Sequence, residues 1–249
     1  MRLSSFEERA AHAVRSLFAH RALVAVALGA LWLGAPASYA ADPAVRSEQE
    51  LATLTFSHEA LSKPVLGSTP LGLVRSRRPI TEERTVLPVL AHRLAGGLRW
   101  LLVMLPGRPN GHTGWIRERE TTLSATSWHL VVDTTRRQVV AYRSGRRMRT
   151  FAAVVGKPST PTPRGEFFVE EDVQLAAASV GAPFALALSA RSNVLQEFEG
   201  GPGQIAVHGL NHVGGVLGTA VSHGCVRLDA AAMSWLVQRI GPGTPVSIR

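Results

Sequence analysis

The chain of 249 residues is 45% hydrophobic and 18% charged, which is too apolar and too weakly charged for an intrinsically disordered protein. Its length allows one large domain, or two smaller domains with a targeting segment. The formal net charge of +9 predicts attraction to anionic polymers, and the charge alone does not select among nucleic acid, anionic lipid and acidic wall polymers.

Residues 1–40 have the layout of a secretory signal peptide. A lead-in with four arginines precedes an uncharged apolar run at residues 22–35, and Ser38 and Ala40 stand where signal peptidase requires small residues. The run is shorter than the roughly 20 residues that a membrane-spanning helix needs. We therefore expect cleavage after Ala40 and export to the cell envelope, either the periplasm or the outer wall. The alternative is a retained anchor, which is the only membrane association we expect.

Export bears on both the charge and the single cysteine. Residues 1–40 contain four arginines and two glutamates, so their removal would leave a mature charge of +7. We expect no nucleic-acid partner, because an exported protein meets little nucleic acid and the sequence has no zinc-finger, RNP or helix-turn-helix pattern. Cys225 is the only cysteine, so its thiol is either paired with another molecule or kept free for chemistry.

The residues after the signal are predicted to form a linker and a small β module. Residues 41–60 are mixed polar and small, and are interpreted as the linker. Residues 61–120 contain short runs rich in Val, Leu and aromatic residues, separated by turn formers, as expected of strands. A strand at residues 100–104, a Pro/Gly/Asn turn and a short strand at residues 114–116 resemble the end of a bacterial SH3-like barrel. The alternative is a β-rich appendage packed on the next domain.

A second, mostly β domain is predicted over residues 125–249, after a short connection at residues 121–126. Its strands are expected at residues 128–133, 138–143, 148–155, 166–169, 184–188, 205–209 and 244–248. The first three form a meander, and the proline-rich loop at residues 156–165 separates them from the rest. One helix is expected at residues 230–240, with Asp229 as its N-cap.

Two segments near the C-terminus place histidines around the only cysteine. His208 ends a predicted strand, and His223 lies two residues before Cys225. The reactive form of cysteine is the thiolate, and a free thiol has a pKa of about 8.5. A nearby imidazole can take the proton and later return it to a leaving amine. We predict His208 as this base, because the loop after its strand is long enough to bring Cys225 alongside. His223 is expected about 6–7 Å away along the strand and to shape the site.

The backbone amides near the Cys225 thiol are candidate oxyanion donors, and a structural cysteine and a zinc site are the alternatives to a nucleophile. Gly224 permits close approach of the backbone, so the amides of Gly224 and Cys225 are expected to point at a developing oxyanion. A lone cysteine is often only a small apolar core residue. Zinc could bind His208, His223 and Cys225, with His212 as a fourth ligand, but the usual zinc-ligand spacings are absent. We expect no metal and no organic cofactor.

Four motifs together resemble the L,D-transpeptidase catalytic domain, also called the YkuD domain, over about residues 125–249. They are IAVHG at residues 205–209, GTAVSHGCVRL at 218–228, TPTPRGEF at 160–167 and GTPVSI at 243–248. The resemblance implies a mainly β, β-sandwich-like catalytic domain with a short C-terminal helix, preceded here by the small SH3-like β module. The Ser-His-Gly-Cys-Val-Arg motif, in order with the upstream His-Gly, is the most specific part.

The resemblance also implies a role for each motif residue. Cys225 is then the acylated nucleophile, and His208 is the base, oriented by a backbone carbonyl in the Gly209 region. Arg227 holds the loop of Cys225 or binds a substrate carboxylate, with a structural salt bridge as the alternative. The remaining residues, which complete the site around the oxyanion donors, are His223, Ser222 and Gly224.

The implied substrate is the peptidoglycan stem peptide, and the implied reaction releases D-Ala from a tetrapeptide donor and forms a 3→3 cross-link. Attack by water in place of an amine would give an L,D-carboxypeptidase, and a protein with an unreactive cysteine would be a wall-binding module. Residues 208–213 read HGLNHV where the family often has His-Gly-Thr-Asn-x-Pro. The loop up to Gly218 is also one residue longer than usual. These departures bear on substrate preference.

Overall fold

The computed structural model describes residues 45–197 and 201–249. The predicted signal peptide lies outside the described residues. Two sheets make up most of the described chain, and both belong to one unit that extends over residues 39–249. No helix in this part of the chain is long and apolar enough to cross a membrane.

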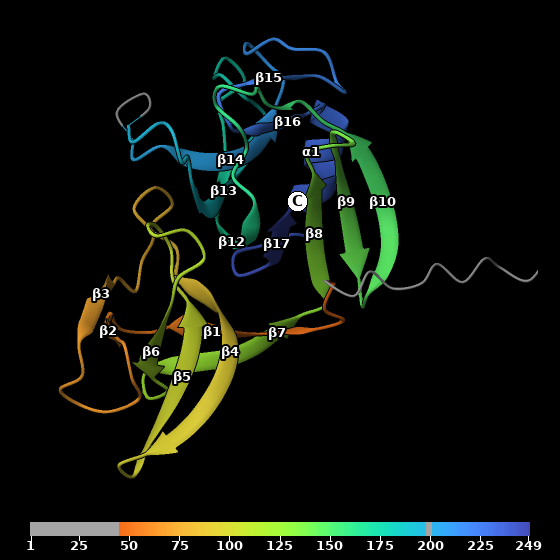
Figure 1. Cartoon of the computed structure of the whole chain (residues 1–249). Helices are drawn as coiled ribbons and strands as arrows, with labels where there is room; N and C mark the ends of the chain where they lie inside the picture. The colour runs from red at the N-terminus through yellow and green to blue at the C-terminus, as the bar shows by residue number, and fades with distance from the viewer. Residues whose placement is uncertain (1–44, 198–200) are drawn as a thin grey trace, which may run out of the picture. The chain divides into compact units, whose positions relative to one another are not determined.

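The N-terminal sheet is antiparallel throughout and has the strand order β3-β2-β6-β5-β4-β1-β7 (Figure 1). Alternating apolar residues of these strands form its core, including the fully buried Leu54, Leu87, Leu101 and Ile116. Its strands are β1 (Gln49–Leu54), β2 (His58–Leu61), β3 (Pro70–Val74), β4 (Val86–Ala95), β5 (Leu98–Met104), β6 (Thr113–Arg117) and β7 (Thr121–Thr126).

Two predictions about this region were wrong. Residues 49–54 and 58–61 are strands β1 and β2, although residues 41–60 were expected to be a linker. Residues 121–126 form β7, which pairs with β1 along its whole length, and are not a bare connection. Both segments are short and polar, so their strand conformation depends on pairing with distant strands. The SH3-like character of the module stays a prediction.

The C-terminal sheet contains the predicted meander and has the order β10-β9-β8-β17-β12-β13-β14-β16. It is antiparallel except where β17 pairs with β8 and where β14 pairs with β16. Its strands are β8 (Trp128–Asp133), β9 (Gln138–Arg143), β10 (Arg146–Ala152), β12 (Gly165–Gln174), β13 (Phe184–Arg191), β14 (Gln204–Gly209), β16 (Val226–Leu228) and β17 (Pro245–Ile248). A separate two-stranded sheet joins β11 (Val155–Gly156) to β15 (Ala220–Ser222). The mainly β fold class is as predicted.

Helix α1 (Ala230–Val237) follows β16 directly. The Asp229 side chain accepts a hydrogen bond from the amide of Ala232 at 2.7 Å, which confirms the predicted N-cap. Met233 and Leu236 are fully buried and belong to the core between the helix and the sheet. The helix therefore fixes the C-terminal end of β16, the strand that follows Cys225.

Strand β12 contributes to both cores, because successive side chains of a strand point to opposite faces. Phe167 packs in the C-terminal core, and Phe168 packs in the N-terminal core. Two residues after Phe168, Glu170 accepts from Arg78 Nη1 at 3.4 Å and from Arg191 Nη2 at 3.1 Å. Burial raises the pKa of Glu170 despite these arginines, and burial lowers the pKa of Arg78. These two buried ion pairs thus carry a desolvation cost.

Candidate active site

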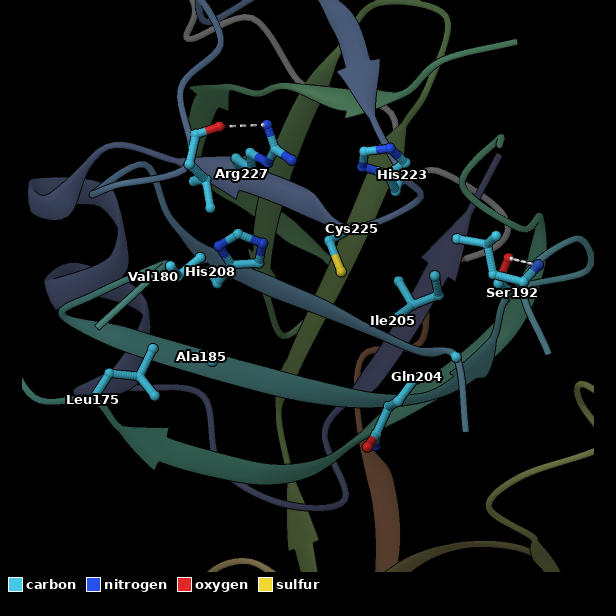
Figure 2. A pocket seen from close by; sticks show the side chains of 13 residues that line it. Leu175, Val180, Ala185, Ser192, Gln204, Ile205, His208, His223, Cys225 and Arg227 are labelled. Atoms are coloured by element: carbon cyan, nitrogen blue, oxygen red, sulfur yellow. Dashed lines mark hydrogen bonds between the residues drawn. The ribbon is translucent and has the colours of Figure 1, made fainter. Parts of the chain in front are cut away.

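A pocket of about 430 Å³ opens beside β14 and β16 in the C-terminal domain (Figure 2). Four of the predicted site residues line it, namely His208, His223, Cys225 and Arg227. The other three, Gly209, Ser222 and Gly224, are buried behind the lining. The structure therefore gathers all seven predicted residues around one cavity.

The register of β14 and β16 explains why the ring and the thiol share a face. Val207 pairs with Val226, and both are fully buried in the core. The alternation of side chains then turns His208 and Arg227 to the opposite face, together with Cys225, which precedes Val226. Figure 2 shows the His208 ring and the Cys225 sulfur projecting from these neighbouring strands into the same cavity. His208 pairs with Arg227, so Cys225 lies diagonally across from His208, two residues before its paired residue.

The backbone fixes the orientation of the His208 ring. Nδ1 donates to the carbonyl oxygen of Gly209 at 2.8 Å, which leaves Nε2 as the basic nitrogen. Gly181 approaches the other side of the ring: a Cβ built on Gly181 would lie 2.6 Å from Nδ1. Gly181 also has φ of +81°, in the left-handed region that favours glycine. A Cβ on Gly209 would overlap the carbonyl oxygen of Ala182. The ring therefore packs against one position that requires glycine, Gly181, and donates to the carbonyl of another, Gly209.

The turn that presents Cys225 is closed by Ser222. The Ser222 hydroxyl donates to the carbonyl oxygen of Cys225 at 2.6 Å and accepts from the amide of Gly224 at 3.1 Å. The Gly224 amide is thus bound inside the turn and does not point at a developing oxyanion, contrary to the prediction from the sequence. Glycine is required at position 224 for two reasons. Its φ is +128°, and a Cβ there would lie 3.0 Å from the Ile205 side chain.

Two threonines of the proline-rich loop support this turn from behind. The Thr160 hydroxyl donates to the carbonyl of Ser222 at 3.2 Å, and the Thr162 hydroxyl donates to the carbonyl of Gly224 at 2.8 Å. The Thr162 oxygen also accepts from the amide of Gly156 at 2.9 Å. The sequence marked this loop only as a family motif, and its contact with the cysteine turn was not predicted.

Arg227 supports the glycine-rich loop that follows β14. Its Nη1 donates to the carbonyls of Val213 at 3.3 Å and Gly214 at 3.2 Å. Among the residues that the structure describes, no carboxylate pairs with Arg227, so the structural salt bridge is not observed. Arg227 therefore holds the loop after β14, and its predicted roles toward the loop of Cys225 or a substrate carboxylate stay predictions.

His223 lies on the exposed rim of the pocket, with its Nε2 3.5 Å from the Nζ of Lys157. An ammonium group can only donate, so Lys157 is the donor in this contact. Lys157 comes from the proline-rich loop and was not predicted as part of the site. No group of three or more His, Cys, Asp or Glu side chains suited to a metal ion occurs within residues 45–197 and 201–249.

Comparisons with known proteins agree with the resemblance in the sequence. Residues 127–248 match a family model described as the L,D-transpeptidase catalytic domain, YkuD. The YkuD protein of Bacillus subtilis (strain 168) is 26% identical over 149 residues, which are 59% of this chain and 73% of that protein.

Solved structures of L,D-transpeptidases are also similar to this chain. An L,D-transpeptidase from Mycobacterium smegmatis is 19% identical with a TM-score of 0.37, covering 66% of this chain and 99% of that chain. L,D-transpeptidase 3 from Mycobacterium tuberculosis, in complex with a faropenem-derived adduct, is 15% identical with a TM-score of 0.42, covering 66% and 91% of the two chains.

Proposed function

We propose that this protein cross-links peptidoglycan through an acyl-enzyme on Cys225. The basis is that residues 127–248 belong to the family of L,D-transpeptidase (YkuD) catalytic domains. L,D-Transpeptidases are acyltransferases that act on peptidoglycan stem peptides. The observation that carries the proposal is the shared pocket of His208 and Cys225, with the ring fixed on the Gly209 carbonyl.

In the first step, the Cys225 thiolate attacks the carbonyl of the third residue of a donor stem tetrapeptide, on its L-centre. His208 Nε2 takes the thiol proton and gives it to the departing amine, so that D-Ala leaves and a thioester remains. The amide of Cys225 is the oxyanion donor in this proposal, since the Gly224 amide is bound to Ser222.

In the second step, the amine on the D-centre of a neighbouring stem's third residue attacks the thioester. His208 takes the proton of this amine and returns it to the sulfur as the thioester breaks, which regenerates the enzyme and gives a 3→3 cross-link. No group outside the chain is required for either step. Exposed rim residues such as Lys157 and His223 are available to the incoming acceptor stem.

The proposed setting is the cell envelope, reached through the signal peptide predicted at residues 1–40. The positive charge of the chain then favours attraction to anionic wall polymers. Stem peptides are present on the outer side of the cytoplasmic membrane, where both the donor and the acceptor occur.

The test is a product assay with disaccharide-tetrapeptide, using the full chain and its Cys225→Ala variant. We expect a cross-linked dimer and free D-Ala from the wild type, and an acyl-enzyme by intact mass that the variant lacks. Tripeptide and D-Ala without dimer would replace the proposal by an L,D-carboxypeptidase. A folded wild-type protein that neither consumes the peptide nor forms an adduct would be a wall-binding module.

A further inference from the structure

A loop of the N-terminal sheet reaches the catalytic pocket through Arg108. This residue lies between β5 and β6, and its guanidinium donates to three backbone carbonyls of the C-terminal domain. Nη2 donates to Ser192 at 2.8 Å and to Leu195 at 3.2 Å, and Nη1 donates to Pro202 at 2.9 Å. One side chain thus connects the two ends of the segment that joins β13 to β14.

Asn110, in the same loop, binds the residue that precedes this segment. Its Nδ2 donates to the carbonyl of Arg191 at 2.8 Å, and its Oδ1 accepts from the amide of Arg191 at 2.8 Å. The amide side chain therefore satisfies both backbone groups of one residue, as a neighbouring strand would. Nδ2 also donates to the side chain of Asn193 at 3.1 Å. Arg108 and Asn110 together are called the clamp below.

The segment held by the clamp forms one wall of the pocket. Ser192, Leu195 and Gly203 of this segment line the cavity that contains Cys225, together with Gln204 and Ile205 at the start of β14. In Figure 2, Ser192 and Ile205 lie on the side of Cys225 opposite to His208. The clamp thus acts on the wall that lies on the other side of the Cys225 sulfur from the His208 ring.

The wall depends on the clamp because it has little pairing of its own. Between the end of β13 at Arg191 and the start of β14 at Gln204, the described residues form no strand or helix. The amide of Ser192 donates to the carbonyl of Gly203 at 2.8 Å, which closes the base of the segment. Arg108 is the side chain that donates hydrogen bonds to the carbonyls of Ser192, Leu195 and Pro202. Hydrogen bonds from a charged donor are stronger than neutral ones, so their loss frees the wall.

We propose that Arg108 and Asn110 are positioning residues for the donor stem, through which the N-terminal sheet builds the pocket wall opposite His208. This inference rests on the proposed function for the identity of the donor. A peptide donor spans the pocket and touches the wall, whereas a small thiol reagent needs only the sulfur and His208. The clamp therefore controls the productive binding of large donors and leaves the intrinsic reactivity of Cys225 unchanged.

The test compares Arg108→Ala with Arg99→Ala in the full chain. Arg99 is an exposed arginine of the same sheet that pairs with Glu118, so its loss changes the charge equally without touching the wall. We expect Arg108→Ala to lower kcat/KM for the tetrapeptide on the order of tenfold or more, mainly through a higher KM. Alkylation of Cys225 by iodoacetamide should change by less than about twofold in either variant, and Arg99→Ala should leave both rates unchanged.

Asn110→Asp provides a second variant, in case Arg108→Ala folds poorly. Aspartate keeps the acceptor for the Arg191 amide but cannot donate to the Arg191 carbonyl. Hydrogen exchange should then accelerate at the amides of Val194 and Leu195, which bond to the Ser192 hydroxyl within the wall, and stay unchanged in β8 and β9. Unchanged tetrapeptide kinetics in both folded variants would overturn the proposal. A parallel loss of iodoacetamide reactivity would also overturn it, because the clamp would then act on the thiol.

A wild-type enzyme that reacts with iodoacetamide but with no stem peptide would contradict the proposed function and leave the role of the clamp to be tested. In that case the peptide is replaced by a carbapenem, a bulky acylating agent, and acylation of Cys225 is followed by intact-mass spectrometry. Slower acylation by the carbapenem together with faster exchange in the wall would still support the clamp, and unchanged values for both would refute it.

Discussion

Replacement of Gly181 by alanine is expected to disable the site while leaving the domain folded. Gly181 has φ of +81°, and an added Cβ would lie 2.6 Å from Nδ1 of His208. The left-handed conformation costs a non-glycine residue about 1–2 kcal/mol. Ordinary contacts begin at 3.4 Å, so the ring must also retreat by about 0.8 Å. This movement strains the hydrogen bond from Nδ1 to Gly209, and a displacement of about 1 Å from the reacting geometry costs on the order of 100-fold in rate.

Gly67→Ala is the matched control for this substitution. Gly67 has φ of +78° and no atom within 4 Å of the added Cβ, so it pays the same conformational cost without a clash. Both variants are expected to lose about 1–2 kcal/mol in urea denaturation. Only Gly181→Ala should lose about 100-fold in acylation of Cys225, measured by single-turnover mass spectrometry. Equal acylation rates in the two variants would show that Gly181 does not position the ring.

Three further predictions concern the cysteine turn, the buried ion pairs and one surface histidine. Thr162→Val should destabilise the protein by about 1–3 kcal/mol and slow acylation of Cys225, because the buried carbonyl of Gly224 loses its hydrogen-bond donor. Thr162→Ser should restore both the stability and the acylation rate. Thermal unfolding measures the stability, and single-turnover mass spectrometry measures the acylation rate. Glu170→Gln should cost about 3–5 kcal/mol in urea denaturation, because two buried arginines lose their carboxylate, and a loss below about 1 kcal/mol would contradict the assignment. The hydrogen bond that His92 donates to Glu50 raises the pKa of His92. This exposed pair should therefore contribute a few tenths of a kcal/mol to stability below about pH 6.5, and that contribution is lost as the pH rises through the raised pKa. Glu50→Gln should abolish that pH dependence of the unfolding free energy, and an unchanged dependence would exclude the pair as its source.

The fold was predictable where a segment's own residues decide its conformation. The meander strands β8 and β9 have the predicted bounds, because short runs of Val, Leu and aromatic residues are bounded by turn formers. The N-cap of α1 at Asp229 was predictable for the same local reason. Strands β1 and β7 were missed, because they are paired chiefly with each other across some 70 residues of sequence, a contact that no local pattern reveals.

The sequence indicated the histidine and the cysteine that share the pocket, but not the contacts that support them. His208 and Cys225 were found because a strand end and a glycine turn are local features, and the pairing of β14 with β16 places both at one pocket. Gly181 and the clamp residue Arg108 act through contacts between segments that are distant in the sequence. The role of the Gly224 amide was wrongly predicted, because its hydrogen bond to the Ser222 hydroxyl depends on the folded turn and not on a local sequence pattern.

The most direct measurement of the central claim is the pH dependence of Cys225 alkylation by iodoacetamide in the wild type and in His208→Gln. If the imidazole ionises the thiol, the wild-type rate should rise with an apparent pKa at least about one unit below 8.5, and the variant should return towards about 8.5. Superimposable profiles for the two folded proteins would show that the ring and the sulfur do not act together, and the proposed catalysis would then have no base at His208.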